Sequence, residues 1–180
     1  MSKLSVPVSS EDHIQGDSTA GCVLVEYGDY ECPSCGQAYP IVKRLQKHFG
    51  DRLSFVFRNF PLSQIHPWAE AAAEAAEYSA SHGKFWEMHD RLYENQDSLS
   101  EALFVKLAAE LGLPSAELTT AVAEQTYLGR IQGEFDGGVR SGVNGTPTFF
   151  MNGQRYNGSY DFASMSDAID RALKAGSSNG

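Results

Sequence analysis

Residues 23–35 read Val-Leu-Val-Glu-Tyr-Gly-Asp-Tyr-Glu-Cys-Pro-Ser-Cys, and this stretch decides the fold. Its first five residues are aliphatic or aromatic apart from one acid, a composition typical of a β-strand. Beyond the cysteines, apolar residues recur at three- and four-residue steps up to Gly50, which predicts a helix that ends there. The pattern therefore places two thiols at the start of a helix that follows a strand.

A helix start suits thiol–disulfide chemistry because the attacking species is the thiolate. Unpaired N–H groups and the positive end of the helix dipole favour an anion there, so Cys32 is expected to have a lowered pKa and to attack. Pro33 fits the first helical position, where its missing N–H has no consequence, and Ser34 adds no charge; these two are the candidate redox-tuning residues. Cys35, one turn on, is expected to be more buried and to resolve the mixed disulfide.

Three acids lie close to the cysteines. Asp29 and Glu31 bring negative charge, so we expect the pKa of Cys32 to be lowered but not extreme. Glu26 interrupts an apolar strand; if buried, its pKa would rise and it could exchange a proton with Cys35. The alternative is that Glu26 faces solvent on an alternating strand.

Composition narrows the class of protein. The 180 residues fit one domain, or one domain with a sizeable insertion, and 42% hydrophobic content supplies a core. A net charge of −9 argues against binding nucleic acid or anionic membranes, and no apolar run is long enough to predict membrane insertion. Residues 1–8 lack the apolar core of a signal peptide, which predicts a cytoplasmic protein; the alternative is a periplasmic or other extracytoplasmic mature form whose signal was removed.

A metal site is not expected. A structural zinc ion needs four ligands, but beyond the Cys32–Cys35 pair the chain has only Cys22 and five scattered histidines. Cys22 is interpreted as a small buried hydrophobe rather than a third redox thiol.

The remaining pattern divides into a helical block between two β-regions. Before the block, Val6 and Val8 suggest an edge strand, residues 53–57 alternate as a second strand, and residues 58–62 follow as a loop. Helical spacing then runs from His66 to about Gly142, with a capping-box pattern at residues 98–101.

Histidines and aromatic residues within the block have two interpretations. The stripe of Phe85, Trp86 and His89 is interpreted as core, and His66, before a proline, as a weak candidate to face the thiols. After the block, residues 145–151 predict a strand, Asn152-Gly153 predicts a hairpin turn, and Asp161 is expected to cap a last helix.

Taken in order, these motifs resemble the DsbA-like branch of the thioredoxin superfamily. The resemblance covers nearly the whole chain and is carried by the strand with Glu26, Cys32-Pro33-Ser34-Cys35, residues 85–90, residues 145–150 and Asn152-Gly153. It implies an α/β thioredoxin fold, a mixed central sheet flanked by helices, with an inserted α-helical domain. The implied parts are residues 1–62, the insertion 63–142, and residues 143–180.

The resemblance also implies roles for particular residues. Thr146-Pro147 would be a cis peptide packed against the thiols, with the Thr146 backbone pairing with the substrate peptide, and Glu26 matches the position of the family's buried acid. One departure concerns redox strength, because strongly oxidising relatives carry a histidine between the cysteines and this chain does not. Known pairs span roughly −270 to −120 mV, and we expect this one toward the middle.

The sequence thus predicts a protein thiol–disulfide oxidoreductase. Cys32 and Cys35 would exchange disulfides with cysteines of protein or peptide substrates, a redox partner would recycle them, and no cofactor would be required. One alternative is a non-catalytic thioredoxin-like binding module with a structural disulfide. Another is a small-molecule glutathione-dependent isomerase, whose relatives usually have serine in place of Cys32. The direction of electron flow, the substrate and the oligomeric state stay open.

Overall fold

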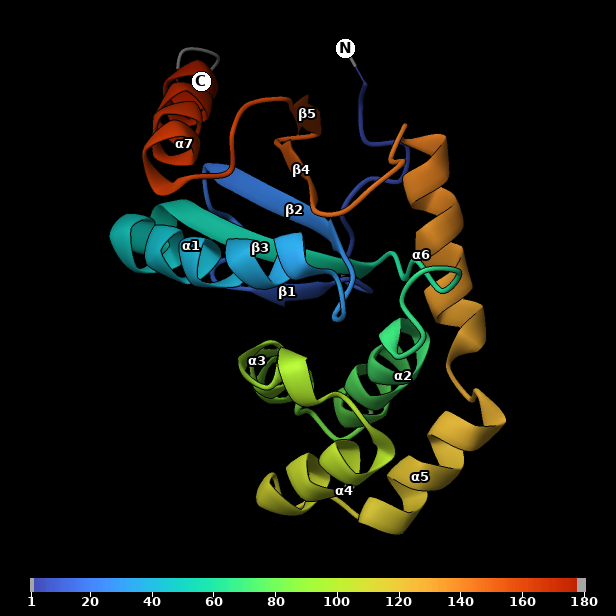
Figure 1. Ribbon diagram of the computed structural model, residues 1–180. Helices are drawn as coiled ribbons and strands as arrows, with labels where there is room; N and C mark the ends of the chain where they lie inside the picture. Colours follow the sequence, from blue (N-terminus) through green and yellow to red (C-terminus); the bar gives the residue numbers. More distant parts are fainter. Residues whose placement is uncertain (1, 178–180) are drawn as a thin grey trace.

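One mixed sheet of five strands organises the chain (Figure 1). The computed structural model describes residues 2–177. The strands lie in the order β1-β3-β2-β4-β5, where the bounds are β1 His13–Gln15, β2 Cys22–Gly28, β3 Leu53–Asn59, β4 Thr148–Met151 and β5 Gln154–Tyr156. The helices are α1 Pro33–Phe49, α2 Ala69–Ala80, α3 Phe85–Glu94, α4 Glu101–Glu110, α5 Ser115–Glu124, α6 Leu128–Arg140 and α7 Phe162–Ser177.

Strand β2 is the centre of the sheet. It pairs parallel with β3, to which α1 connects it, and antiparallel with β4. Because successive side chains on a strand point to opposite faces, Leu24 joins the larger core cluster on the α1 side, whereas Val25 and Tyr27 join a smaller cluster on the other side. Both faces of β2 are therefore buried, which explains its nearly continuous apolar sequence.

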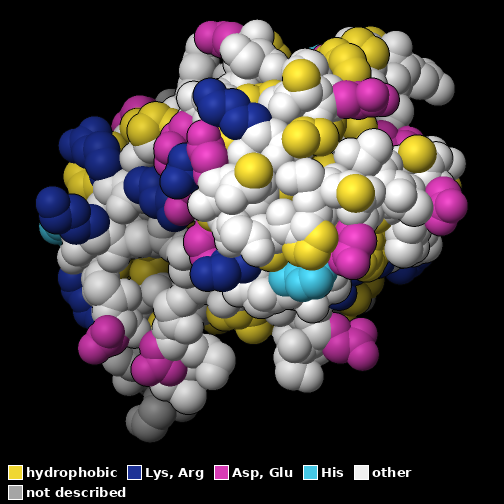
Figure 2. Space-filling model, turned by 90° about the horizontal axis from the view of Figure 1, so that it is seen from below, with side chains coloured by type: hydrophobic (Ala, Val, Ile, Leu, Met, Phe, Trp, Pro, Cys, Tyr) yellow, Lys and Arg dark blue, Asp and Glu magenta, His cyan; other side chains and the backbone are white. Residues whose placement is uncertain are grey.

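Helices α2 to α6 form the block between β3 and β4. In Figure 1 this block extends from the sheet, and α6 returns alongside it to the start of β4. Figure 2 looks onto the molecule from below, where apolar side chains are scattered among acidic and basic ones. The mixed sheet flanked by helices, with helices inserted between its two halves, confirms the predicted fold class.

Three expectations at element ends were wrong. The edge strand is β1 at residues 13–15, not the segment around Val6 and Val8, and β3 continues through Arg58 and Asn59, which were expected to lie in a loop. The N-cap of α4 is Ser100, whose side chain accepts a hydrogen bond from the Leu103 N–H at 3.1 Å, so the helix begins two residues later than a cap at Ser98 would place it.

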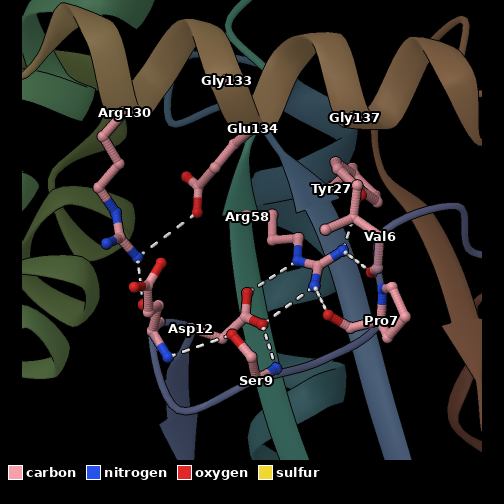
Figure 3. A pocket seen from close by; sticks show the side chains of 11 residues that line it. Val6, Pro7, Ser9, Asp12, Tyr27, Arg58, Arg130, Gly133, Glu134 and Gly137 are labelled. Atoms are coloured by element: carbon pink, nitrogen blue, oxygen red, sulfur yellow. Dashed lines mark hydrogen bonds and ion pairs between the residues drawn. The ribbon is translucent and has the colours of Figure 1, made fainter.

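Buried Arg58 helps to hold the N-terminal segment in place. Its guanidinium donates to both carboxylate oxygens of Asp12 at 2.8 and 3.0 Å, to the Tyr27 hydroxyl at 2.9 Å, and to the carbonyls of Val6 and Pro7 at 2.8 and 3.3 Å. Figure 3 shows these groups converging at one side of a pocket of about 200 Å³. A buried charge is tolerated when it is paired and hydrogen-bonded, so the segment is fastened by side-chain bonds.

Helix α6 packs closely against the sheet at Gly138. A methyl group at Gly138 would lie 2.8 Å from the Phe60 ring and 3.0 Å from the Tyr27 ring. By contrast, a methyl group at Gly133 in the same helix would meet no atom within 4 Å. Close packing of α6 on Tyr27 and Phe60 therefore requires glycine at position 138 but not at position 133.

We predict opposite effects for alanine at these two positions. Gly138→Ala should lower the free energy of unfolding by roughly 1–2 kcal/mol, because overpacking displaces aromatic rings in a close-packed core. Gly133→Ala should raise it by roughly 0.5–1 kcal/mol, because alanine loses less conformational entropy in a helix. Urea unfolding followed by circular dichroism measures both. Equal changes in the two variants would contradict the packing argument.

Candidate active site

The motif Cys32-Pro33-Ser34-Cys35 forms the first turn of α1. Cys32 is the N-cap residue, with extended backbone angles (φ −67°, ψ 121°), and Pro33 is the first residue of the helix. Cys32 is 7% exposed and Cys35 only 1% exposed, and both are free thiols. The helix start therefore gives one thiol some access to solvent and buries the other.

The two thiols have opposite pKa shifts. A hydrogen bond with the Cys35 side chain lowers the pKa of Cys32 to about 5. Partial burial opposes this shift, and Thr146 and the N–H groups of Cys35 and Ser34 assist it. Burial, the hydrogen bond with Cys32 and the nearby carboxyl of Glu26 raise the pKa of Cys35 well above its ordinary value. Near neutral pH the pair therefore holds one proton, on Cys35.

The loop before β4 reaches the same place from the far end of the chain. Cys32 Sγ lies 3.5 Å from the Thr146 carbonyl oxygen, to which it donates when protonated, and the Thr146-Pro147 peptide bond is cis. Both residues of this bond are half-buried. The structure thus brings together residues that are 114 positions apart in the sequence.

Glu26 lies beneath the thiols in the sheet. It is 3% exposed and pairs in register with Phe57 on β3 and Phe149 on β4, so it does not face solvent as the alternative interpretation required. Its Oε2 has no hydrogen-bond partner among the described residues. Burial and the negative charge of Cys32 raise the pKa of Glu26 to about 8.

Asp29 and Glu31 are hydrogen-bonded to groups other than the thiols. The Asp29 carboxylate is buried and accepts hydrogen bonds from the Glu31 and Leu62 N–H groups at 2.8 and 2.9 Å, and it lies 2.7 Å from His66 Nδ1. The Glu31 carboxylate accepts from the Trp68 N–H at 2.8 Å. Both charges are bound by donors around them, and the lowered pKa of Cys32 has other causes.

The histidines of the helical block separate into two environments. His66, the weak candidate to face the thiols, is paired with Asp29 and remains partly exposed. His89 is fully in the core, as the aromatic stripe predicted, and its Nδ1 lies 2.9 Å from the Tyr30 hydroxyl. Cys22 is likewise completely buried in the core, as predicted.

One contact of the site had no signal in the sequence. Gln96 begins a short 3₁₀ turn, Gln96–Ser98, between α3 and α4, within a stretch of polar residues. Its side-chain amide donates to the carbonyls of Tyr30 and Cys32 at 2.9 and 2.8 Å. The helical block therefore contacts the active-site loop directly.

The described residues contain neither a metal-binding cluster nor a membrane-spanning helix. Between residues 2 and 177, the structure brings together no group of three or more His, Cys, Asp or Glu side chains that could hold a metal ion. In the same part of the chain, no helix has the length and apolar character needed to cross a membrane.

The sheet, the inserted helices and the cysteine pair beside the Thr146-Pro147 loop define a DsbA-type thioredoxin fold. The model of the family described as thioredoxin matches residues 9–171, and the chain belongs to this family. The predicted resemblance to DsbA-like proteins is confirmed by this match together with the solved structures that share the fold.

Two solved structures illustrate that likeness. The chain superposes on BdbD from Bacillus subtilis with a TM-score of 0.86 and 24% identity, covering 96% of this chain and 98% of that one. It superposes on a thioredoxin-like oxidoreductase from Silicibacter pomeroyi DSS-3 with a TM-score of 0.78 and 25% identity, covering 92% and 94%.

Curated relatives by sequence carry a different description. The chain is 43% identical over 171 residues to the protein described as Na(+)/H(+) antiporter NhaA 1 of Salinispora arenicola, covering 94% of this chain and 26% of that protein. It is 42% identical over 173 residues to NhaA 1 of Mycobacterium sp. strain KMS, covering 94% and 28%. The chain thus spans about a quarter of the length of these relatives.

Burial of Glu26 makes stability depend on pH. The folded-state pKa of about 8 lies above the ordinary value of 4.5, so between these values the unfolded chain has lost a proton that the folded protein retains. Wild-type stability from this group is therefore full below pH 4.5 and falls as pH rises toward 8. Glu26→Gln in the reduced protein should gain a few kcal/mol relative to wild type at pH 7.5 and little at pH 4.5.

Urea unfolding at the two pH values measures this difference. The exposed Glu124→Gln is the matched control and should leave stability nearly unchanged at both. An equal gain for Glu26→Gln at pH 4.5 and pH 7.5 would contradict the assignment.

Proposed function

We propose that this chain is a thiol–disulfide oxidoreductase that exchanges disulfides with the cysteines of polypeptide substrates. The observation that carries the proposal is the geometry of two neighbouring thiols: Cys32 is the partly accessible N-cap of α1 beside the Thr146 carbonyl, and Cys35 is buried. The lowered pKa of Cys32 and the raised pKa of Cys35 agree with this arrangement. A thiolate at a helix start is a nucleophile, and a buried protonated thiol beside an acid is suited to a second, delayed attack.

In the reducing direction the proposed steps balance as follows. The Cys32 thiolate attacks a substrate disulfide, forming a mixed disulfide and releasing one substrate thiolate. The mixed disulfide removes the Cys32 charge that helps to keep Glu26 protonated, so Glu26 can release its proton to solvent. The Glu26 carboxylate then accepts the Cys35 proton as Cys35 attacks Cys32 Sγ, which closes the Cys32–Cys35 disulfide and releases the second substrate thiolate. Two electrons pass from the dithiol to the substrate, and the oxidising direction is the reverse.

Thr146 and Pro147 are proposed to hold the substrate. The support is their position: the Thr146 carbonyl lies 3.5 Å from the attacking sulfur, and both residues are partly accessible. An extended substrate peptide could pair with the Thr146 backbone while its cysteine meets Cys32. In this proposal residues 1–62 and 143–180 form the redox part, and residues 63–142 form the inserted domain.

The pKa of Cys32 also bears on redox strength. A value of about 5 lies between the values of thioredoxin, about 7, and DsbA, about 3.5. A more stable thiolate stabilises the reduced protein and makes the disulfide a stronger oxidant. We therefore propose an intermediate potential, with a separate redox partner that recycles the pair; Pro33 and Ser34 would tune that potential.

Cysteine variants test the proposed chemistry. Cys32→Ser should abolish reduction of insulin, because the nucleophile is lost. Cys35→Ser should still attack but accumulate mixed disulfides, which non-reducing electrophoresis with a cysteine-containing peptide reveals. Cys22→Ala, a buried cysteine at the far end of β2, is the matched control and should retain activity. Undiminished turnover by Cys32→Ser would refute the proposal.

The reduction potential distinguishes the proposal from a binding module with a structural disulfide. Equilibration in glutathione buffers should give a value between roughly −270 and −120 mV. A structural disulfide would instead resist the buffer, with a potential below about −300 mV. Alkylation of free thiols followed by mass spectrometry measures the fraction of Cys32 and Cys35 that is reduced.

A further inference from the structure

Among the contacts between the inserted block and the active-site loop, the Gln96 side chain is the one that reaches the Cys32 carbonyl. Gln96 Nε2 donates to the Tyr30 carbonyl at 2.9 Å and to the Cys32 carbonyl at 2.8 Å. An amide nitrogen carries two hydrogens, so one Gln96 side chain can satisfy both carbonyls. The acceptors are 66 and 64 positions away in the sequence.

The two carbonyls lie at and just before the start of α1. Cys32 is the N-cap of α1, and its carbonyl also accepts the first bond of the helix, from the Gly36 N–H at 3.1 Å. On the N–H side of the same loop, Glu31 donates to the Asp29 carboxylate and Cys32 donates to the Asp29 carbonyl at 3.2 Å. Asp29 thus accepts hydrogen bonds from two N–H groups of this loop, and the Gln96 amide donates to two of its carbonyls.

Gly36 provides the space for this contact. A methyl group at Gly36 would lie 2.2 Å from Gln96 Oε1 and 2.9 Å from its Cδ, too close for the amide to stay in place. Gly36 is helical and does not need glycine for its backbone angles. Because Gly36 has no side chain, it leaves room for the Gln96 amide one position after Cys35.

We propose that Gln96 is a positioning residue that sets the acidity of Cys32. Fixing the Cys32 and Tyr30 carbonyls fixes the start of α1, so the Ser34 and Cys35 N–H groups stay directed at Cys32 Sγ. The amide hydrogens also offset two carbonyl dipoles close to a developing negative charge. Gln96 touches neither sulfur, and it acts through the peptide groups that flank Cys32.

The inference rests on the proposed function for its effect on turnover, but the pKa is measured without any substrate. Gln96→Ala should raise the pKa of Cys32 by roughly half a unit to one unit, the equivalent of losing one or two modest hydrogen bonds. Gln96→Glu, which has the same shape but no amide donor, should raise it at least as much. The rate of Cys32 alkylation by iodoacetamide between pH 3 and pH 9 gives each value.

Two further variants separate positioning from general damage. Asn95→Ala removes a bond within the same turn, from Asn95 Nδ2 to the Arg91 carbonyl, and should leave the pKa of Cys32 unchanged. Gly36→Ala should raise the pKa in the wild type by displacing Gln96, and should produce no further rise in Gln96→Ala. An unchanged pKa in Gln96→Ala, or an equal effect of Gly36→Ala in both backgrounds, would overturn the inference. If Cys32→Ser remained active while Gln96→Ala shifted the pKa, only the proposed function would fail.

Discussion

The position of Cys32 at the N-cap of α1 is the constraint on which the site depends. An N-cap residue has extended backbone angles but already directs its carbonyl into the helix, which leaves the next N–H groups free to point back at its side chain. Here the side chain is a thiol, and the N–H groups of Ser34 and Cys35 stabilise it as an anion. A helix that began one residue earlier or later would separate the sulfur from these donors.

The alternation of β2 supplies the other half of the chemistry. Because Glu26 shares a face with Leu24, its carboxyl lies on the α1 side, where it faces the cysteines rather than the α6 side. Burial there raises the pKa of Glu26, and the carboxyl in turn raises that of Cys35. A strand register shifted by one residue would move the acid to the opposite face, so the proton acceptor depends on sheet register as strictly as the nucleophile depends on helix start.

Local patterns predicted most of the fold, and long-range contacts explain what they missed. The helix start at the cysteines, the hairpin at Asn152-Gly153, with positive φ at both residues, and the Asp161 cap each follow from neighbouring residues, and each is present. The edge strand around Val6 was wrong: the Val6 carbonyl accepts a hydrogen bond from the buried Arg58 side chain, and no periodicity reveals this contact. Gln96 was missed for the same reason, since its partners lie more than 60 positions away.

Asp29 shows that the charge of a neighbour in sequence does not by itself determine the acidity of Cys32. From the sequence its carboxylate is an anion three residues from Cys32, and simple proximity predicts repulsion. In the structure it is turned away toward Leu62, Glu31 and His66, where three donors surround it. Its backbone carbonyl accepts a hydrogen bond from the Cys32 N–H, and its backbone hydrogen bond partly offsets the rise in the pKa of Cys35. Proximity in sequence therefore predicts that Asp29 destabilises the thiolate, whereas in the structure Asp29 stabilises the loop. The difference lies in the direction of the side chain, which only tertiary structure fixes.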